Sequence, residues 1–276
     1  MIPSELTDTY HILSKEQSFP DLFPPGAILL IDKPLAWTSF DVVKKVRGAL
    51  VRRTGLKKLK VGHAGTLDPL ATGLLIVCVG NYTRLIDTLQ AMSKSYSGVI
   101  TLGATTPSFD LEKGVDTTFP TDQVTNALLQ EKRLGFVGDI LQVPPIFSAV
   151  KVDGKRLYKN ARTGEEVELP HRPVQIASFE LSQLRPVPAG GRTEAIIAGD
   201  RGATIMLHPD YPEGVQVDFE VVCSKGTYIR SLANDLGQAV GSGGYLSSLR
   251  RTGSGGFSAA DAWEVEELIS WIRGEK

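Results

Sequence analysis

A single aspartate in a turn rich in glycine and proline is the strongest candidate for chemistry in this chain. Residues 62–73 read GHAGTLDPLATG. The glycines permit backbone conformations closed to other residues, and Pro69 restricts Asp68 to an extended conformation. The apolar run 74–79 predicts a strand buried on both faces, so Asp68 would lie next to the core. A carboxylate held there could act as a nucleophile or stabilise positive charge, although the spacing alone fits an ordinary turn equally well.

The segment 62–75 also resembles the catalytic segment of the TruB family of tRNA pseudouridine synthases, which isomerise a uridine in the T loop of tRNA. Further blocks similar to the family follow in order: DKP at 32–34, TS at 38–39, KSY at 94–96, VPP at 143–145, SKGTYIR at 224–230 and LRR at 249–251. The resemblance covers residues 28–251. It implies the pseudouridine synthase fold, an isomerase that needs no cofactor or metal, and tRNA, through its T stem and loop, as the partner.

The resemblance implies a role for each of several residues. Asp68 is the catalytic carboxylate, Arg230 its ion-pair partner, and Tyr96 the ring that stacks on the target base. His63, Tyr228, Leu249, Lys33 and Lys94 are the implied substrate-binding residues. Taken alone, most of these side chains would pass for packing residues. Whether Asp68 attacks the sugar or assists an unsaturated sugar intermediate stays open.

Basic residues are concentrated in one part of a nearly neutral chain. The net charge is −1, which is not the global signature of a nucleic-acid binder. Eight basic residues with no acid between them lie at 44, 45, 47, 52, 53, 57, 58 and 60. We expect Lys44, Lys45, Arg52, Arg53, Lys151 and Arg162 to contact the RNA backbone. A solvated helix face is the alternative interpretation of the cluster.

The order of predicted elements indicates an α+β fold with a largely antiparallel mixed sheet flanked by helices. Strands are expected at 28–31, 74–79, 94–102, 174–184, 194–198, 205–207 and 215–223. Helices are expected at 38–53, 121–132, 230–240 and 261–272, the first and last opening with possible capping boxes at Thr38 and Asp261. We expect an N-terminal arm at 1–25 and a catalytic domain at 26–276. The domain carries an RNA-gripping insertion at about 143–172, an unassigned insertion at about 186–214 and no evident appended RNA-binding domain.

Composition excludes several other classes of protein. Cys78 and Cys223 lie in apolar runs, which favours buried reduced thiols in a cytoplasmic protein. The four histidines lack ligand spacing, and no apolar run approaches the length of a membrane span. We therefore expect no metal site, no membrane and no obligatory protein partner. A tRNA-binding or folding protein without catalysis is the main alternative; a hydrolase with an Asp nucleophile lacks a visible base or phosphate loop.

Overall fold

The computed structural model describes residues 4–20, 23–145, 151–152, 155–156, 171–189, 195–198 and 204–275. The contacts divide the chain into two compact units. Unit 1 contains Met1–Tyr96, Ile197–Ile205 and Arg250–Lys276, and unit 2 contains Ser97–Ile196 and Met206–Leu249. The chain passes between the units four times: within two long strands, β4 (Lys94–Leu102) and β15 (Gly244–Ser254), and within two short ones, β12 (Ala195–Ala198) and β13 (Thr204–Leu207).

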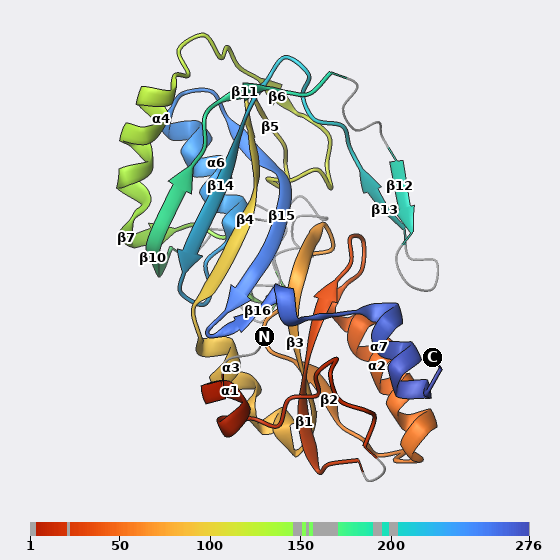
Figure 1. The fold of residues 1–276 in the computed structure, drawn as a ribbon. Helices are drawn as coiled ribbons and strands as arrows, with labels where there is room; N and C mark the ends of the chain where they lie inside the picture. The colour runs from red at the N-terminus through yellow and green to blue at the C-terminus, as the bar shows by residue number, and fades with distance from the viewer. Residues whose placement is uncertain are drawn as a thin grey trace. The chain divides into compact units, whose positions relative to one another are not determined.

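Unit 1 is a sheet with helices on both faces (Figure 1). Besides parts of β4 and β15, its strands are β1 (Gly26–Lys33), β2 (Val61–His63), β3 (Ala71–Gly80), β16 (Phe257–Ser258) and β17 (Trp263–Glu264). Its helices are α1 (Ser4–Thr9), α2 (Ser39–Thr54), α3 (Ile86–Ala91) and α7 (Val265–Arg273), with 3-10 turns at Asn81–Leu85 and Ala259–Asp261. The strand order is β17–β1–β3–β15. The β1–β3 pair is antiparallel and the β1–β17 pair parallel.

The central strands of unit 1 are buried on both faces. Leu29 of β1 and Val77 of β3 belong to the cluster that packs under α2 and α7. Ile28 and Ile76, one residue along, belong to the cluster on the α3 face. Neighbouring side chains of a strand point to opposite faces of the sheet. The side chains on both faces of β1 and β3 must therefore be apolar. The predicted buried strand at 74–79 is confirmed.

Helix α2 begins where the sequence predicts. Thr38 is the N-cap, its hydroxyl accepts a hydrogen bond from Asp41 N, and the Asp41 carboxylate accepts one from Thr38 N at 3.0 Å. This reciprocal capping box satisfies backbone donors that the first turn leaves unpaired. The helix ends at Gly55, which adopts the left-handed conformation with φ 73°.

Two predicted helix starts are wrong. The last helix begins at Val265 rather than Asp261, because Trp263 and Glu264 form β17 and pair with β1, which leaves Trp263 2% exposed. Helix α4 (Asn126–Arg133) begins five residues after the predicted Thr121, because the Thr125 hydroxyl accepts from Leu128 N and caps it there. In both places a tertiary or capping contact outweighs the local pattern.

The described residues before β1 pack against unit 1. Leu13 is 2% exposed, and its carbonyl accepts a hydrogen bond from the indole Nε1 of Trp263 at 3.0 Å. The Trp271 indole donates to the Gln17 carbonyl at 2.7 Å, and the Phe19 ring packs edge-on against Trp271. Residues 4–20 are thus part of the fold of unit 1.

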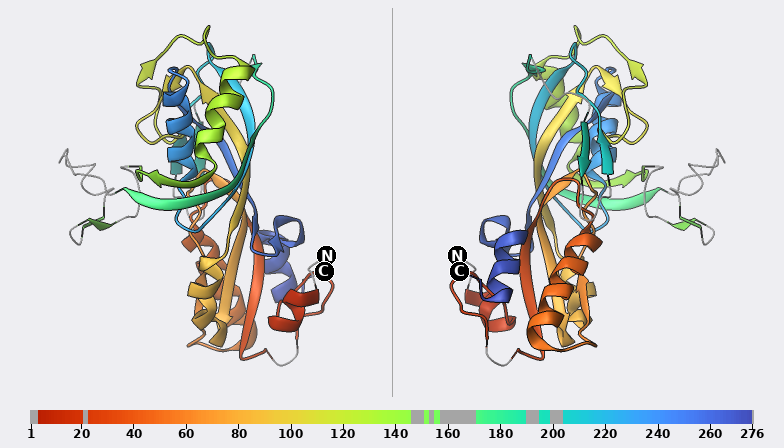
Figure 2. Two further views of the ribbon diagram at one scale, coloured as in Figure 1. Left: turned by 90° about the vertical axis from the view of Figure 1, so that its left-hand side faces the viewer. Right: turned by 90° about the vertical axis from the view of Figure 1, so that its right-hand side faces the viewer.

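The part of unit 2 that the structure describes contains a largely antiparallel sheet and two helices. Strands β7 (Gly138–Gln142), β10 (Arg172–Leu181), β11 (Arg185–Pro186) and β14 (Val215–Cys223) join the unit 2 parts of β4 and β15 in the order β15–β4–β14–β10–β7, and β11 pairs with β14. Helix α4 packs on β10 and beside α6 (Ile229–Ala239), as Figure 2 shows. A 3-10 turn, Leu134–Phe136, follows α4, and β5 (Ala104–Thr105) pairs with β6 (Thr117–Thr118). The predicted α+β class with a largely antiparallel mixed sheet is confirmed.

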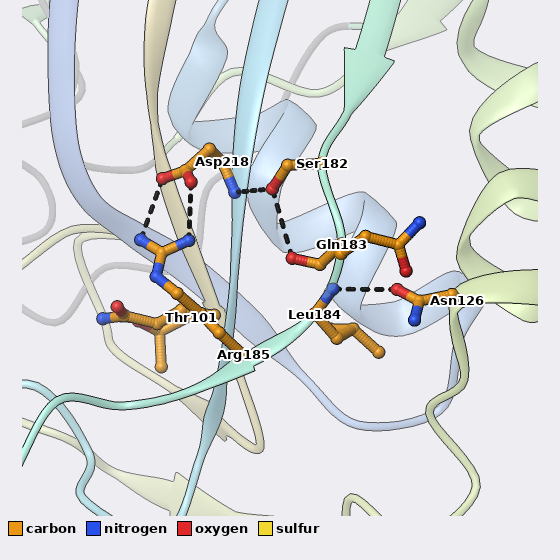
Figure 3. Close-up of polar contacts among 8 residues, drawn as sticks. Thr101, Asn126, Ser182, Gln183, Leu184, Arg185 and Asp218 are labelled. Atoms are coloured by element: carbon orange, nitrogen blue, oxygen red, sulfur yellow. Dashed lines mark hydrogen bonds and ion pairs between the residues drawn. The ribbon is translucent and has the colours of Figure 1, made fainter.

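Side chains fix the turn that follows β10 (Figure 3). Arg185 forms two hydrogen bonds with the Asp218 carboxylate, at 2.7 and 2.8 Å. The Ser182 hydroxyl accepts from Asp218 N at 3.0 Å, and Asn126 Oδ1 accepts from Leu184 N at 2.8 Å. Strand β10 ends at Leu181, three residues before the predicted end. Ser182 N still donates to the Asp218 carbonyl of β14, but Leu184 N bonds to the Asn126 side chain instead of a neighbouring strand.

Both predicted insertions are described only in part. In the first, β8 (Lys151–Val152) pairs antiparallel with β9 (Lys155–Arg156), and residues 146–150, 153–154 and 157–170 lie outside the described residues. In the second, β12 (Ala195–Ala198) pairs with β13 (Thr204–Leu207), and residues 190–194 and 199–203 lie outside. Both cysteines are free and buried, as expected, and burial raises the pKa of the Cys78 thiol to about 12. Among the described helices, none is both long and apolar enough to span a membrane.

Candidate active site

Two glycines shape the turn that presents Asp68. Gly65 and Gly73 have φ values of 98° and 97°, in the left-handed region that other residues rarely adopt. A Cβ atom at Gly73 would also lie 2.3 Å from the Arg251 carbonyl oxygen, so β3 approaches β15 too closely for any side chain. Ala71 N donates to the Asp68 carbonyl at 3.0 Å and closes the turn. The Asp68 side chain is half-buried.

Lys33 ties this turn to the loop before α2. Its side chain is fully buried, and its ammonium donates to the carbonyls of Pro34 at 2.9 Å, Trp37 at 2.5 Å and Pro69 at 3.3 Å. Pro69 is the residue after Asp68. Burial lowers the pKa of Lys33 to about 7, and the negative charge of Asp68 is the largest opposing influence. Lys33 therefore holds the turn through hydrogen bonds, and the charge of Asp68 influences its pKa.

Two further side chains hold the residues on either side of Asp68. The Ser39 hydroxyl accepts from Leu67 N at 2.9 Å and donates to Leu67 O at 3.2 Å. Arg251, 2% exposed, donates from Nε to Leu74 O at 2.6 Å and from its terminal nitrogen to Gly65 O at 3.2 Å. Both residues lie in family-like blocks, but nothing in the sequence indicated that they hold this turn. The turn is thus fixed on each side by side chains from other elements.

Arg250 makes a further polar contact in this region. Its guanidinium donates to both oxygens of Asp32, at 2.9 and 2.5 Å, and these bonds raise the pKa of Arg250 above its usual value. Asp32 precedes Lys33 in β1, so the bidentate pair fixes β15 to the strand that carries Lys33. Sequence reasoning missed this pair, because 218 positions separate its members.

His63 and Tyr96 are the other predicted site residues of unit 1. His63 lies in β2 opposite Val77, and burial, with a smaller contribution from Arg251, lowers its pKa. The imidazole is therefore neutral at physiological pH, which suits packing against a base better than binding a phosphate. Tyr96 is half-buried in β4. Lys94 is 5% exposed, and its ammonium donates to the carbonyls of Gln90 and Met92 at 2.6 Å each, so it supports the end of α3.

Arg230, Tyr228 and Leu249 belong to unit 2. Arg230, in the first turn of α6, is 5% exposed and donates to the Ser108 carbonyl at 3.0 Å. The Asp110 carboxylate lies 3.8 Å from it and supplies the counter-ion that a buried arginine near a helix N-terminus needs. Asp110 had no signal in the sequence. The predicted Asp68–Arg230 pair would join the two units and stays a prediction.

Gln142 holds the backbone beside Arg230. Its side-chain oxygen accepts from Tyr228 N at 2.7 Å, and its side-chain nitrogen donates to Tyr228 O at 2.9 Å. Gln142 is 1% exposed, and Tyr228 is the N-cap residue of α6. The last residue of β7 thus sets where α6 begins. Leu249 is half-buried near the end of the unit 2 part of β15.

The basic residues that are predicted to contact the RNA backbone differ in exposure and in pairing with acidic side chains. Lys44, Arg52 and Arg53 are exposed on α2. Lys45 forms an ion pair with Glu266 at 2.9 Å, so part of its charge is already neutralised. Lys151 lies in β8, and Arg162 lies outside the described residues. In the described part of the chain, no group of three or more His, Cys, Asp or Glu side chains is arranged to hold a metal ion.

Comparison with known proteins gives a consistent result across the chain. A model of the TruB family pseudouridylate synthase N-terminal domain matches residues 52–229, and one of the tRNA pseudouridylate synthase B C-terminal domain matches residues 230–275. The tRNA pseudouridine synthase B of Flavobacterium johnsoniae is 46% identical over 89% of this chain and 96% of its own length. That of Phocaeicola vulgatus is 46% identical over 91% and 94%, respectively.

Solved structures agree on the fold. A chain from a crystal structure of a Cbf5–Nop10–Gar1 complex is 26% identical with a TM-score of 0.58, and the match covers 92% of this chain and 60% of that one. A chain from an H/ACA RNP bound to a substrate RNA containing 2′-deoxyuridine has a TM-score of 0.56 at 23% identity, over 94% and 62%. This chain therefore belongs to the TruB family of pseudouridylate synthases and has their fold.

Proposed function

We propose that this chain acts on a uridine of the tRNA T loop, with Asp68 as the essential carboxylate. Family membership makes the chain a tRNA pseudouridine synthase, an isomerase. The observation that carries the proposal is the support of the Asp68 turn: Lys33, Ser39 and Arg251 bond to Pro69, Leu67, Leu74 and Gly65 around it. A group that only ends a turn does not need such support, whereas a reacting group does.

The reaction sets clear requirements on the site. The bond from N1 to C1′ breaks, the uracil turns, a bond from C5 to C1′ forms, and the proton on C5 is exchanged for one on N1. Atoms and electrons balance without an oxidant or an energy source. A fixed carboxylate stabilises C1′ while the base is detached, either by attack or by charge. We assign this role to Asp68 and the role of keeping it ionised to Arg230 and Lys33.

A uridine in a folded loop reaches such a site only after it leaves the stack. We assign stacking on the uracil to Tyr96, lining of its pocket to Tyr228 and Leu249, and support of the displaced RNA to the neutral His63. Lys44, Arg52 and Arg53 would hold phosphates of the stem, with Lys151 and Arg162 as further predicted contacts. We place the activity in the cytoplasm, with the T stem and loop as the recognised part of tRNA and no obligatory protein partner.

The test compares two Asp→Asn substitutions on unmodified tRNA. Asp68→Asn should abolish pseudouridine formation while tRNA affinity stays within about tenfold, because basic side chains supply most of the binding. Asp122→Asn, the same chemical change at an exposed position, should behave like the parent. Pseudouridine is located by mass analysis of RNA fragments. Turnover by Asp68→Asn, with deamidation excluded, would contradict the assignment.

Hairpins test the choice of loop. A T stem-loop hairpin should be modified almost as efficiently as full tRNA, and an anticodon stem-loop hairpin should not be modified. Binding of tRNA without any pseudouridine from the parent protein would favour the alternative of a tRNA-binding protein without catalysis. Modification at a different loop would retain the enzyme but overturn the T-loop assignment.

A further inference from the structure

An exposed phenylalanine lies on the turn of α2 that is bonded to the Asp68 segment. Phe40 is 58% exposed, and Leu35 in the preceding loop is 37% exposed. Ser39, next to Phe40 in the chain, bonds to both backbone groups of Leu67, the residue before Asp68. The Phe40 ring is thus an apolar surface presented to solvent on a rigid support close in structure to the reacting carboxylate.

A cation lies over this ring. The Lys44 ammonium, one helical turn further on, is 4.5 Å from the centre of the Phe40 ring, within the range of a cation–π contact. The neighbouring Lys45 lies 5.4 Å from the Trp37 ring but is paired with Glu266. Because Lys44 is exposed, its ammonium can exchange the contact with the Phe40 ring for an RNA phosphate at a small cost in free energy.

The charge of α2 indicates what kind of partner fits this surface. Asp41 is the single acidic residue of the helix, and its carboxylate accepts from both the backbone N and the hydroxyl of Thr38. The exposed residues that follow Phe40 along the helix are basic: Lys44, Arg47, Arg52 and Arg53. Lys44 and Arg47, four and seven positions after Phe40, lie on the same side of the helix as the ring. An aromatic ring beside cations matches a nucleic acid, which offers flat bases and phosphates.

We propose that Phe40 and Lys44 form a contact for the substrate RNA, separate from the uridine-binding residues. An unpaired base stacks on the Phe40 ring, and the Lys44 ammonium binds the adjacent phosphate. This inference rests on the proposed function, because it takes the tRNA substrate as the ligand of this surface. It adds a base-stacking residue in a stretch where the sequence indicated charge alone.

The experiment measures tRNA affinity, and the salt dependence of that affinity, for four variants. Phe40→Ala should weaken binding by about 5- to 150-fold, the loss typical of one stacked base. Phe40→Tyr should retain the affinity, whereas Phe40→Leu, still apolar, should lose it. Lys44→Gln should reduce the slope of log affinity against log salt by about 0.7 to 0.9, the share of one phosphate, whereas the Phe40 variants should leave the slope unchanged.

Leu134→Ala is the matched control, since Leu134 is 63% exposed and lies in unit 2. It should bind like the parent. Equal affinity of Phe40→Ala and the parent, or equal losses in Phe40→Leu and Phe40→Tyr, would overturn the proposal. A parent protein that forms no pseudouridine refutes the proposed function by a separate measurement, because the binding series does not depend on turnover.

Discussion

Replacing Lys33 by methionine tests whether burial or the surrounding acceptors control the charge of this side chain. The ammonium is fully buried and donates to three carbonyls, and its pKa falls from 10.5 to about 7. In the unfolded chain, Lys33 returns to the ordinary value. Between these two values the unfolded state binds more protons than the folded state, so stability must rise with pH.

The size of the effect follows from the two pKa values. Below about pH 7 both states are protonated and above about pH 10.5 both are neutral, so the change is confined to the window between. In this window the free energy of unfolding rises with pH at up to about 1.4 kcal/mol per pH unit. From about pH 7.5 to 9.5 the contribution of Lys33 to it increases by about 2.5 kcal/mol. Lys33→Met has no group that titrates there. The parent should therefore gain that amount relative to the variant.

Urea unfolding followed by tryptophan fluorescence measures this difference. All three tryptophans, Trp37, Trp263 and Trp271, lie in unit 1 with Lys33, so the signal reports the relevant unit. Lys58→Met, at an exposed lysine, should give a curve parallel to the parent. If the curve of Lys33→Met is also parallel to that of the parent, the three carbonyls and Asp68 stabilise the charged ammonium as well as water does. Burial then does not lower the pKa of Lys33.

Two further predictions concern the Asp68 turn and Arg230, the predicted partner of Asp68. Gly73→Ala should lower the free energy of unfolding by more than about 3 kcal/mol, because it combines a left-handed φ with a Cβ placed 2.3 Å from a carbonyl oxygen. Gly48→Ala in α2, where the nearest atom to the new Cβ is 3.9 Å away, should raise it by up to about 1 kcal/mol. Chemical denaturation measures both changes, and equal effects of the two substitutions would contradict the geometry. Arg230→Ala should be nearly as inactive as Asp68→Asn, and the double variant should be no worse than either, since residues that act as one unit are not additive. Independent, multiplying losses of kcat/KM would count against the predicted ion pair.

Local patterns predicted most elements well. The capping box at Thr38 and the apolar run at 74–79 depend on neighbours in the chain, and α2 and β3 form where expected. The late start of α7 shows the opposite case, because Trp263 is drawn into the sheet by β1, which lies more than 200 positions away. A local window contains no information on such a partner.

The residues of the candidate site also fall into two groups, those that the sequence indicated and those that it did not. Family-like blocks indicated Asp68 and Arg230 as reacting residues, but not what holds each in place. Arg251 bonds to the backbone 177 positions away, Gln142 bonds to the backbone 86 positions away, and Asp110 pairs with the buried Arg230, 120 positions away. Such support depends on the register of packed strands and helices, which the residue types alone do not determine.

The position of Arg251 has a consequence for the order in which the protein matures. Its bond to Leu74 spans 177 positions, so at roughly 5–20 residues per second the Asp68 turn waits about 9–35 s on the ribosome for this partner. Strand β17 and helix α7, which complete the sheet and core of unit 1, are made even later. During that interval Ile31 and Asp32 of β1 lack the strand that pairs with them, and this part of the sheet edge is open to wrong pairing. The Asp68 turn should therefore become rigid only after Arg251 is made, and the nascent chain should be inactive until β17 and α7 emerge.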